Sequence, residues 1–163
     1  MAKIRYGFIS NSSSSSFILA LDRKPETIED MKELLFGTDE FYPDPYRDGG
    51  YPTLKVAETV FNDIKDQKPM SRDQVFEELG TGWLEGAPDY NSFKDKTKDY
   101  GIDWKAYQKA CREFQDNSAD DLILEFKGKE LYLVEYYDDS AYGCALEHGT
   151  VFDKICTYRL SKH

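Results

Sequence analysis

The chain has 163 residues, of which 40% are hydrophobic and 15% aromatic, and it carries a net charge of −10. This length and hydrophobic content exclude intrinsic disorder, so we expect a single domain over residues 1–163. The excess of carboxylates disfavours direct binding to nucleic acid, which depends on Lys and Arg contacts to phosphates. It suits a basic protein partner, although solubility alone is the simpler explanation.

The cysteines and apolar runs limit the cellular setting. The chain has three cysteines without CxxC spacing, which argues against a disulfide framework and a cysteine-rich zinc site. No apolar run approaches the roughly 20 residues that a membrane span needs. Lys3 and Arg5 resemble the start of a signal peptide, but a polar run from Ser10 to Ser16 replaces the apolar segment that must follow. We therefore expect a cytoplasmic protein with no membrane contact and no metal or cofactor.

Taken in chain order, the first predicted element is a buried strand at 17–21, where five apolar residues follow one another. Pro25 is predicted to begin a helix that runs to about Phe36 and ends at Gly37. Residues 38–52 are predicted to form an irregular loop, because three prolines and a pair of glycines interrupt regular structure.

Several further helices are predicted in the middle of the chain. Thr53 can cap one of them, and Ser71 with Gln74 forms a capping box for the next. A short helix is predicted at 90–99. Asp103 is expected to cap another, in which aromatic and small apolar residues recur at helical spacing.

The last part of the chain predicts strands. Alternating apolar and polar residues favour strands at 121–126 and 130–137, joined by a tight turn, and a final strand at 154–160. With a helical middle over about 25–116, the pattern predicts an α+β fold with a small, mostly antiparallel sheet. We expect the strand at 17–21 to be inserted beside the terminal ones.

Five consecutive serines are the most unusual feature of the sequence. Apolar residues on both sides, such as Ile9 and Phe17, favour a fixed loop leading into the strand over a flexible linker. Hydroxyls and backbone amides in such a loop can form an anion site. They can equally hydrogen-bond locally as turns, which is the favoured interpretation. The candidate ligand-binding serines are Ser12, Ser13, Ser14 and Ser15.

The opening of the chain also carries a family resemblance. Gly7-Phe8-Ile9-Ser10-Asn11, followed by the serines and Phe17, resembles a signature that begins many small uncharacterised proteins of tailed bacteriophages and their bacterial hosts. The match covers about the first twenty residues, and the segment from Ala145 to the terminal Leu-Ser-Lys-His is similar to the ends of some members. The resemblance implies an origin and a reused N-terminal module, and it implies no activity.

Residues 138–149 form the second candidate site, because they combine a histidine and a thiol with carboxylates. Glu147, His148, Asp138 and His163 are ligand types for a divalent metal. Cys144 with His148 could act as a nucleophile pair. No ligand spacing is diagnostic and no third catalytic group is evident, so a structural histidine is favoured. Whether the protein is an enzyme is left open.

Aromatic side chains suggest a third candidate, a partner-binding surface. Tyr and Trp beside Asp and Arg are typical of interaction hot spots. The same rings can instead fold back and cover the helices, and the sequence does not separate the two. The candidate partner-binding residues are Tyr42, Tyr46, Tyr51 and Trp83.

These features give three functional hypotheses. The preferred one is a phage-type accessory protein that binds a host protein. The bound protein could be a defence or nucleic-acid enzyme that is thereby inhibited, since an acidic surface can mimic a phosphate backbone. The second is a small enzyme or ligand-binding protein with a site between the serine loop and Glu147–His148. The third is a virion-associated structural protein. The sequence does not predict the oligomeric state.

Overall fold

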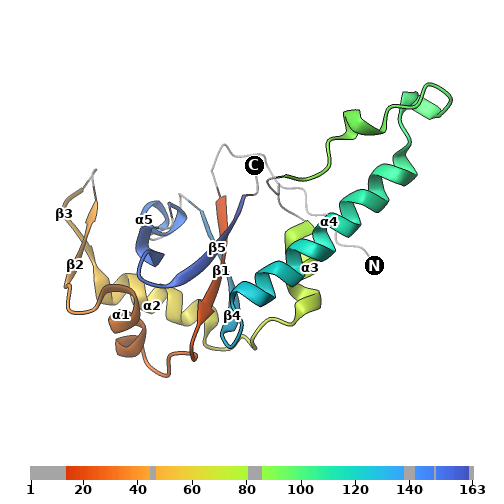
Figure 1. The fold of residues 1–163 in the computed structure, drawn as a ribbon. Coiled ribbons are helices and arrows are strands. Elements are labelled where there is room, and N and C mark those ends of the chain that lie inside the picture. The colour runs from red at the N-terminus through yellow and green to blue at the C-terminus, as the bar shows by residue number, and fades with distance from the viewer. Residues whose placement is uncertain (1–13, 45–46, 81–85, 138–141, 149, 162–163) are drawn as a thin grey trace, which may run out of the picture.

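The computed structural model describes residues 14–44, 47–80, 86–137, 142–148 and 150–161. Over these residues the fold is α+β, as predicted, with an antiparallel three-stranded sheet and a separate two-stranded one (Figure 1). In chain order the elements are β1 (Ser14–Leu21), α1 (Ile28–Phe36), β2 (Phe41–Asp44), β3 (Arg47–Pro52), α2 (Thr53–Ile64), α3 (Arg72–Gly80), α4 (Trp104–Glu125), β4 (Glu130–Tyr137), α5 (Gly143–Glu147) and β5 (Cys156–Ser161), with 3₁₀ turns at Tyr90–Phe93, Asp99–Gly101 and Thr150–Phe152.

The three-stranded sheet has the order β4–β1–β5. The first strand lies beside strands from the last part of the chain, as expected, and it lies between two of them, which the sequence did not predict. Ser14 pairs with Tyr137, and Ser15 pairs with Ser161 on the other side. The strand therefore begins three residues earlier than predicted. Ser14, Ser15 and Ser16 are strand residues and not part of a loop, because Ser14 pairs with β4, and Ser15 and Ser16 pair with both β4 and β5.

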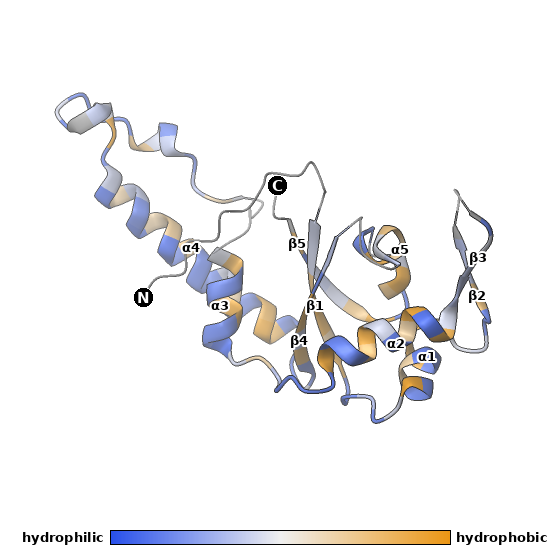
Figure 2. Cartoon of the chain, turned by 180° about the vertical axis from the view of Figure 1, so that it is seen from behind, coloured by the Kyte–Doolittle hydropathy of each residue, from blue (hydrophilic) through white to orange (hydrophobic). Residues whose placement is uncertain are grey.

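The two faces of this sheet bury separate apolar clusters. Phe17, Leu19 and Leu21 pack on one face against α1, α2 and α5, whereas Ile18 and Ala20 pack on the other against α3 and α4. Figure 2 shows hydrophobic colouring along the helix faces that meet the sheet. A strand that is buried on both faces reads as an unbroken apolar run, which explains why this strand was visible in the sequence.

The strand predicted at 121–126 is wrong, because these residues form the last turns and the C-cap of α4. Ala119, Leu122 and Phe126 are buried at helical spacing, while Leu124 is 68% exposed. A short apolar run fits either a strand or a buried helix face, and here packing against α3 selects the helix. The turn predicted after it is the link from α4 to β4.

The irregular loop predicted at 38–52 is also wrong, because most of it forms the β2–β3 hairpin. In a two-stranded sheet each strand is an edge, where proline is tolerated. Gly50 has a positive φ of 65°, and a Cβ there would collide with the backbone carbonyl of Tyr42. Gly50 therefore permits the close approach of the two strands. The predicted helical middle over 25–116 is interrupted by this hairpin.

Two predicted helix starts are shifted. The first helix begins at Ile28 and not at Pro25, because Thr27 caps it and forms a capping box with Asp30. Thr53 does not cap α2 but is its first residue, and its Oγ1 donates a hydrogen bond of 2.7 Å to the carbonyl of Asp39. A threonine therefore lies at the start of each of these helices, as the cap of α1 and as the first residue of α2.

The remaining helix signals can be checked individually. The Ser71–Gln74 capping box is confirmed, with reciprocal hydrogen bonds of 2.8 and 3.3 Å. Asp103 caps α4 by accepting from the amide of Ala106 at 3.1 Å. Residues 90–99 contain a 3₁₀ turn and the start of a second in place of the predicted α-helix. Within the described residues, no helix has the length and apolar character that a membrane span requires.

Candidate functional site: a groove between α3 and β4

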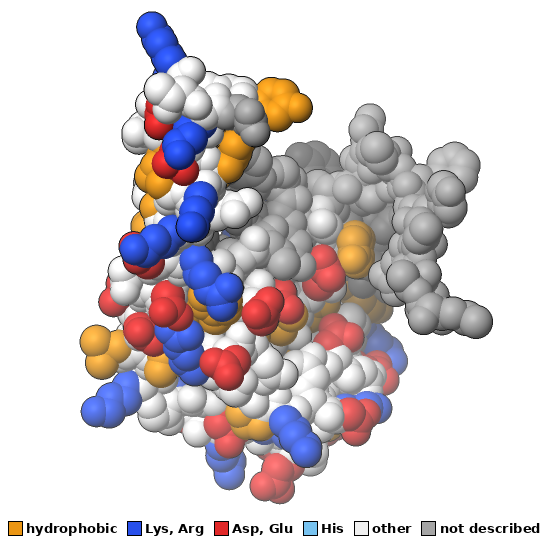
Figure 3. All heavy atoms as spheres, turned by 90° about the vertical axis from the view of Figure 1, so that its right-hand side faces the viewer, with side chains coloured by type: hydrophobic (Ala, Val, Ile, Leu, Met, Phe, Trp, Pro, Cys, Tyr) orange, Lys and Arg blue, Asp and Glu red, His pale blue; other side chains and the backbone are white. Residues whose placement is uncertain are grey.

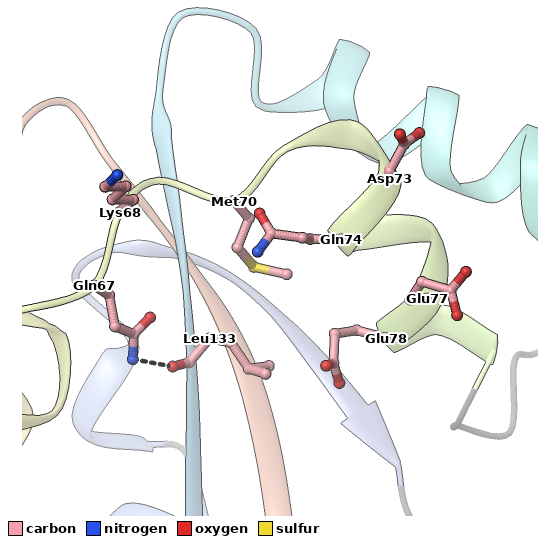
Figure 4. Close-up of a pocket in the computed structure, with 8 residues that line it drawn as sticks. All are labelled: Gln67, Lys68, Met70, Asp73, Gln74, Glu77, Glu78 and Leu133. Carbon is pink, nitrogen blue, oxygen red and sulfur yellow. Dashed lines mark hydrogen bonds between the residues drawn. The ribbon is translucent and has the colours of Figure 1, made fainter.

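Two surface hollows of similar size are lined by different elements. One, of about 500 Å³, is bordered by charged residues at the end of β1 and along α1. The other, of about 490 Å³, runs between α3 and the outer side of β4. The lining of the second is the more apolar, and Met70 and Leu133 form its floor (Figure 4). An apolar floor with polar walls is the usual form of a binding surface, so this groove is the candidate site.

The floor of the groove is built by the connection between α2 and α3, which runs along the outer edge of β4. The amide of Met70 donates a hydrogen bond of 2.8 Å to the carbonyl of Leu131. The side chain of Gln67 donates to the carbonyl of Leu133, also at 2.8 Å. These bonds occupy edge groups of β4 that would otherwise be open to another strand.

A lysine on the opposite side of the connection fixes it further. Lys24 donates through Nζ to the carbonyls of Lys65 and Gln67, at 2.9 and 2.8 Å. Its backbone amide donates to the carboxylate of Glu130, which also accepts from the hydroxyl of Tyr132 at 2.7 Å. Burial, together with this carboxylate, raises the pKa of Tyr132 well above its ordinary value. The tyrosine therefore stays a neutral donor and holds this network in place.

The other wall of the groove is α3, which is attached firmly to α4. Val75 and Leu79 are buried between the two helices. Arg72 bridges to Asp116 at 2.6 Å and to Asp120 at 2.8 Å. The face of α3 that borders the groove is therefore presented by a rigid element.

The walls of the groove are predominantly acidic. Asp73, Glu77 and Glu78 lie along α3, whereas Lys68 is the one cation among the residues that line it. Figure 4 shows Gln74 and Glu78 nearest to the apolar floor, with Asp73 and Glu77 farther out on the helix. On the adjoining face over α3 and α4, carboxylates are interspersed with Lys and Arg (Figure 3). Three carboxylates around apolar side chains favour a ligand that is both cationic and apolar.

The predicted serine site is only partly described. Ser12 and Ser13 lie outside the described residues, and Ser14 is half-buried at the start of β1. Ser15 is buried, and its hydroxyl accepts a hydrogen bond of 2.7 Å from Nη2 of Arg159. Ser16 is fully buried, and its hydroxyl has no partner among the described residues.

Glu147 and His148 lie at the end of α5, which contacts both β1 and β4. Glu147 and His148 are therefore on an element that packs against the three-stranded sheet. Glu147 is buried, His148 is exposed, and Cys144 is half-buried. In the part of the chain that the structure describes, no three His, Cys, Asp or Glu side chains are grouped so that they could hold a metal. Asp138 and His163, the other two metal-ligand candidates, lie outside it.

The candidate aromatic residues divide in the same way. Tyr46 and Trp83 lie outside the described residues. Tyr42 packs edge-on against Phe36, with ring centroids 5.8 Å apart, and its hydroxyl hydrogen-bonds to that of Thr150. Tyr51 packs edge-on against Tyr142 at 5.6 Å.

Both described tyrosines are half-buried against the core, whereas their neighbour Phe41 is 60% exposed. The hairpin therefore presents Phe41 more openly than either tyrosine.

The groove itself was not found from the sequence. The acidic spacing of Asp73 and Glu77, four residues apart on a predicted helix, was available as a signal. Met70 and Leu133 are 63 positions apart in the numbering and meet only through the packing of α3 beside β4.

Comparisons with known proteins add no further evidence, because no family model, curated protein or solved structure matches the chain.

Proposed function

We propose that the protein is a phage-type accessory protein that binds a host protein through the groove between α3 and β4. The occupant is a partner segment in which Lys or Arg residues flank a large apolar side chain. Such segments are common on proteins that bind nucleic acid. Inhibition of a defence or nucleic-acid enzyme would follow if the groove competes for that basic surface.

One observation carries the proposal, namely the combination of apolar floor and acidic wall. Met70 and Leu133 can bury an apolar side chain, which contributes most of the affinity in a small interface. Asp73, Glu77 and Glu78 can select against acidic segments, because like charges at an interface are costly. The net charge of −10 supports the same partner, since it speeds the encounter with a basic surface.

Synthetic peptides with a central leucine, flanked by lysine, glutamine or glutamate, test the proposal. We expect binding to the full chain to decrease in that order, as measured by fluorescence anisotropy at low and high salt. The combined substitution Asp73→Lys and Glu77→Lys should reverse the order. Met70→Gln should weaken all three peptides equally, because it changes the floor and not the charge.

The matched control places the same charge change elsewhere. Glu40→Lys with Asp48→Lys, on exposed residues in and before the β2–β3 hairpin, should leave the order unchanged. An equal response to both double substitutions would show a general charge effect and would overturn the groove as the site. Stronger peptide binding after Lys3→Glu and Arg5→Glu would identify the chain's own first residues as the occupant, and it would also refute the proposal.

A further inference from the structure

The hydrogen bonds along β4 show which backbone N–H and C=O groups of the sheet point away from its centre. The carbonyls of Leu131 and Leu133 accept from Met70 and from the side chain of Gln67, both of which lie outside the sheet. In an antiparallel strand the N–H and C=O of one residue point to the same side, and successive residues alternate. The backbone N–H and C=O groups of Leu131 and Leu133 therefore point away from β1, and those of Tyr132, between them, hydrogen-bond to β1.

The same alternation identifies the outer edge of β5. Leu19 pairs with Tyr132, so its backbone groups point towards β4 and those of Ile18 point towards β5. Ile18 pairs with Tyr158, which therefore bonds inward. The neighbours Thr157 and Arg159 direct their N–H and C=O groups outward, where no described residue hydrogen-bonds to them. Unlike the edge of β4, this edge is open over the described chain.

Arg159 gives the open edge a specific charge. Its side chain is held in place, since Nη2 donates to Ser15 at 2.7 Å and the guanidinium lies 5.7 Å from the ring centroid of Phe17. Arg159 is exposed, and no described carboxylate forms an ion pair with it. Arginine has five N–H donors, so several remain for another molecule. An ordered, unpaired guanidinium is unexpected in a chain with a net charge of −10.

We propose that the outer edge of β5 binds an extended segment of a partner protein as an added strand, with an Asp or Glu of that segment opposite Arg159. Directly opposed residues of paired strands have Cβ atoms about 5 Å apart, within reach of a guanidinium–carboxylate pair. Main-chain hydrogen bonds supply affinity in this mode, and the side chains supply selectivity. The site is independent of the groove, which lies at the opposite edge of the sheet and takes the opposite charge.

A second copy of the chain is a poorer occupant. Residues 156–161 contain no carboxylate, so β5 paired with itself would leave Arg159 without an acid. A two-fold antiparallel pairing would also bring two copies of Arg159 close together on one face, which is destabilising.

Amide hydrogen exchange of the free, full-length protein tests whether the edge is open. The amides of Thr157 and Arg159 should exchange much faster than those of Tyr158 and Leu160, which bond to β1. Slow exchange at all four positions, independent of protein concentration, would show that the chain itself covers the edge. Protection that grows with concentration would show self-association. Either result overturns the proposal.

Charge-swapped peptides then test the occupant. The probes are two short peptides of alternating valine and threonine, one with a central glutamate and one with a central lysine. Amide NMR should show the glutamate peptide perturbing Thr157 and Arg159 and binding about fivefold more tightly, from cross-strand charge pairs of up to about 1 kcal/mol. Arg159→Glu should reverse this preference. Thr157→Pro removes an outward N–H and should abolish binding, with the inward ladder intact.

Lys154→Glu is the control, because it changes the charge of an exposed residue just before β5 by the same amount. It should leave the preference for the glutamate peptide in place. Equal binding of both peptides to the unchanged protein, or a preference that Arg159→Glu does not reverse, would refute the proposed occupant. Because the probes carry no lysine-flanked leucine, these results do not depend on the groove.

Discussion

Two adjacent serines of β1 should respond in opposite directions to the same substitution. Ser15 is 2% exposed, and its hydroxyl accepts a hydrogen bond of 2.7 Å from Arg159. Ser16 is 0% exposed, and its hydroxyl has no partner among the described residues. A hydrogen bond contributes about 1 kcal/mol net, whereas a buried polar group without a partner costs about 1–3 kcal/mol. Alanine at the two positions therefore removes a stabilising group in one case and a destabilising group in the other.

We expect Ser15→Ala to lower the free energy of unfolding by about 1 kcal/mol, the lower part of the range for charged donors because Arg159 is exposed. Ser16→Ala should raise it by about 1 kcal/mol, after allowance for the small void that the oxygen leaves. The two variants should melt about 3 °C below and above the unchanged protein, respectively. Urea denaturation followed by circular dichroism measures both, and strand propensity largely cancels between them.

The two variants control for one another, because each makes the same chemical change in the same strand. A loss of stability in Ser16→Ala as large as that in Ser15→Ala would show that both hydroxyls have partners. That result would refute the reasoning. Arg159→Met should abolish the difference between serine and alanine at position 15 and leave position 16 unaffected.

Three further predictions concern pH, the hairpin and a helix start. Burial raises the pKa of Tyr136 well above 10.0, with Asp63 adding to the shift, so the contribution of Tyr136 to stability is complete below pH 10.0 and is lost above it. Tyr136→Phe should therefore reduce the loss of stability at alkaline pH, as measured by urea denaturation at a series of pH values. An unchanged dependence on pH would contradict this. Gly50→Ala should destabilise the protein by about 2 kcal/mol more than Gly49→Ala in thermal melts. Both glycines have positive φ, but only Gly50 meets the opposite strand. Equal losses of stability in the two variants would argue against this close approach. Thr27→Ala should lower the free energy of unfolding by about 1 kcal/mol, because it removes the cap of α1. Unchanged stability of this variant in calorimetry would contradict the prediction.

The elements that the sequence predicted correctly depend on local chemistry. The Ser71–Gln74 box and the Asp103 cap involve residues three apart, so their pattern can be recognised without knowledge of the fold. β1 was recognised because burial on both faces leaves an unbroken apolar run. Its position beside strands from the last part of the chain was also expected, but the strand order β4–β1–β5 is a tertiary property that the sequence did not predict.

The elements that could not be predicted are decided by packing between distant segments. Residues 121–126 have an apolar pattern that fits two structures, and contact with α3 decides between them. The prolines of 38–52 obscured a hairpin, because they are tolerated only where a strand forms an edge, and the sequence does not show which strands are edges. Met70 and Leu133 show no sign of a groove until the connection after α2 lies along β4. The candidate site was therefore less predictable than the fold.

The place of β1 between two late strands has a consequence for synthesis on the ribosome. Ser15 and Arg159, which bond across the sheet, are 144 positions apart. The hydrophobic run of β1 leaves the ribosome long before either of the strands that flank it, because the segment from α1 to α4 is translated in between. Throughout that interval an aggregation-prone segment is exposed, as in other folds dominated by distant pairings. The nascent chain should therefore depend on chaperones until β5 has left the exit tunnel, and ribosome-stalled chains that lack β5 should remain sensitive to protease.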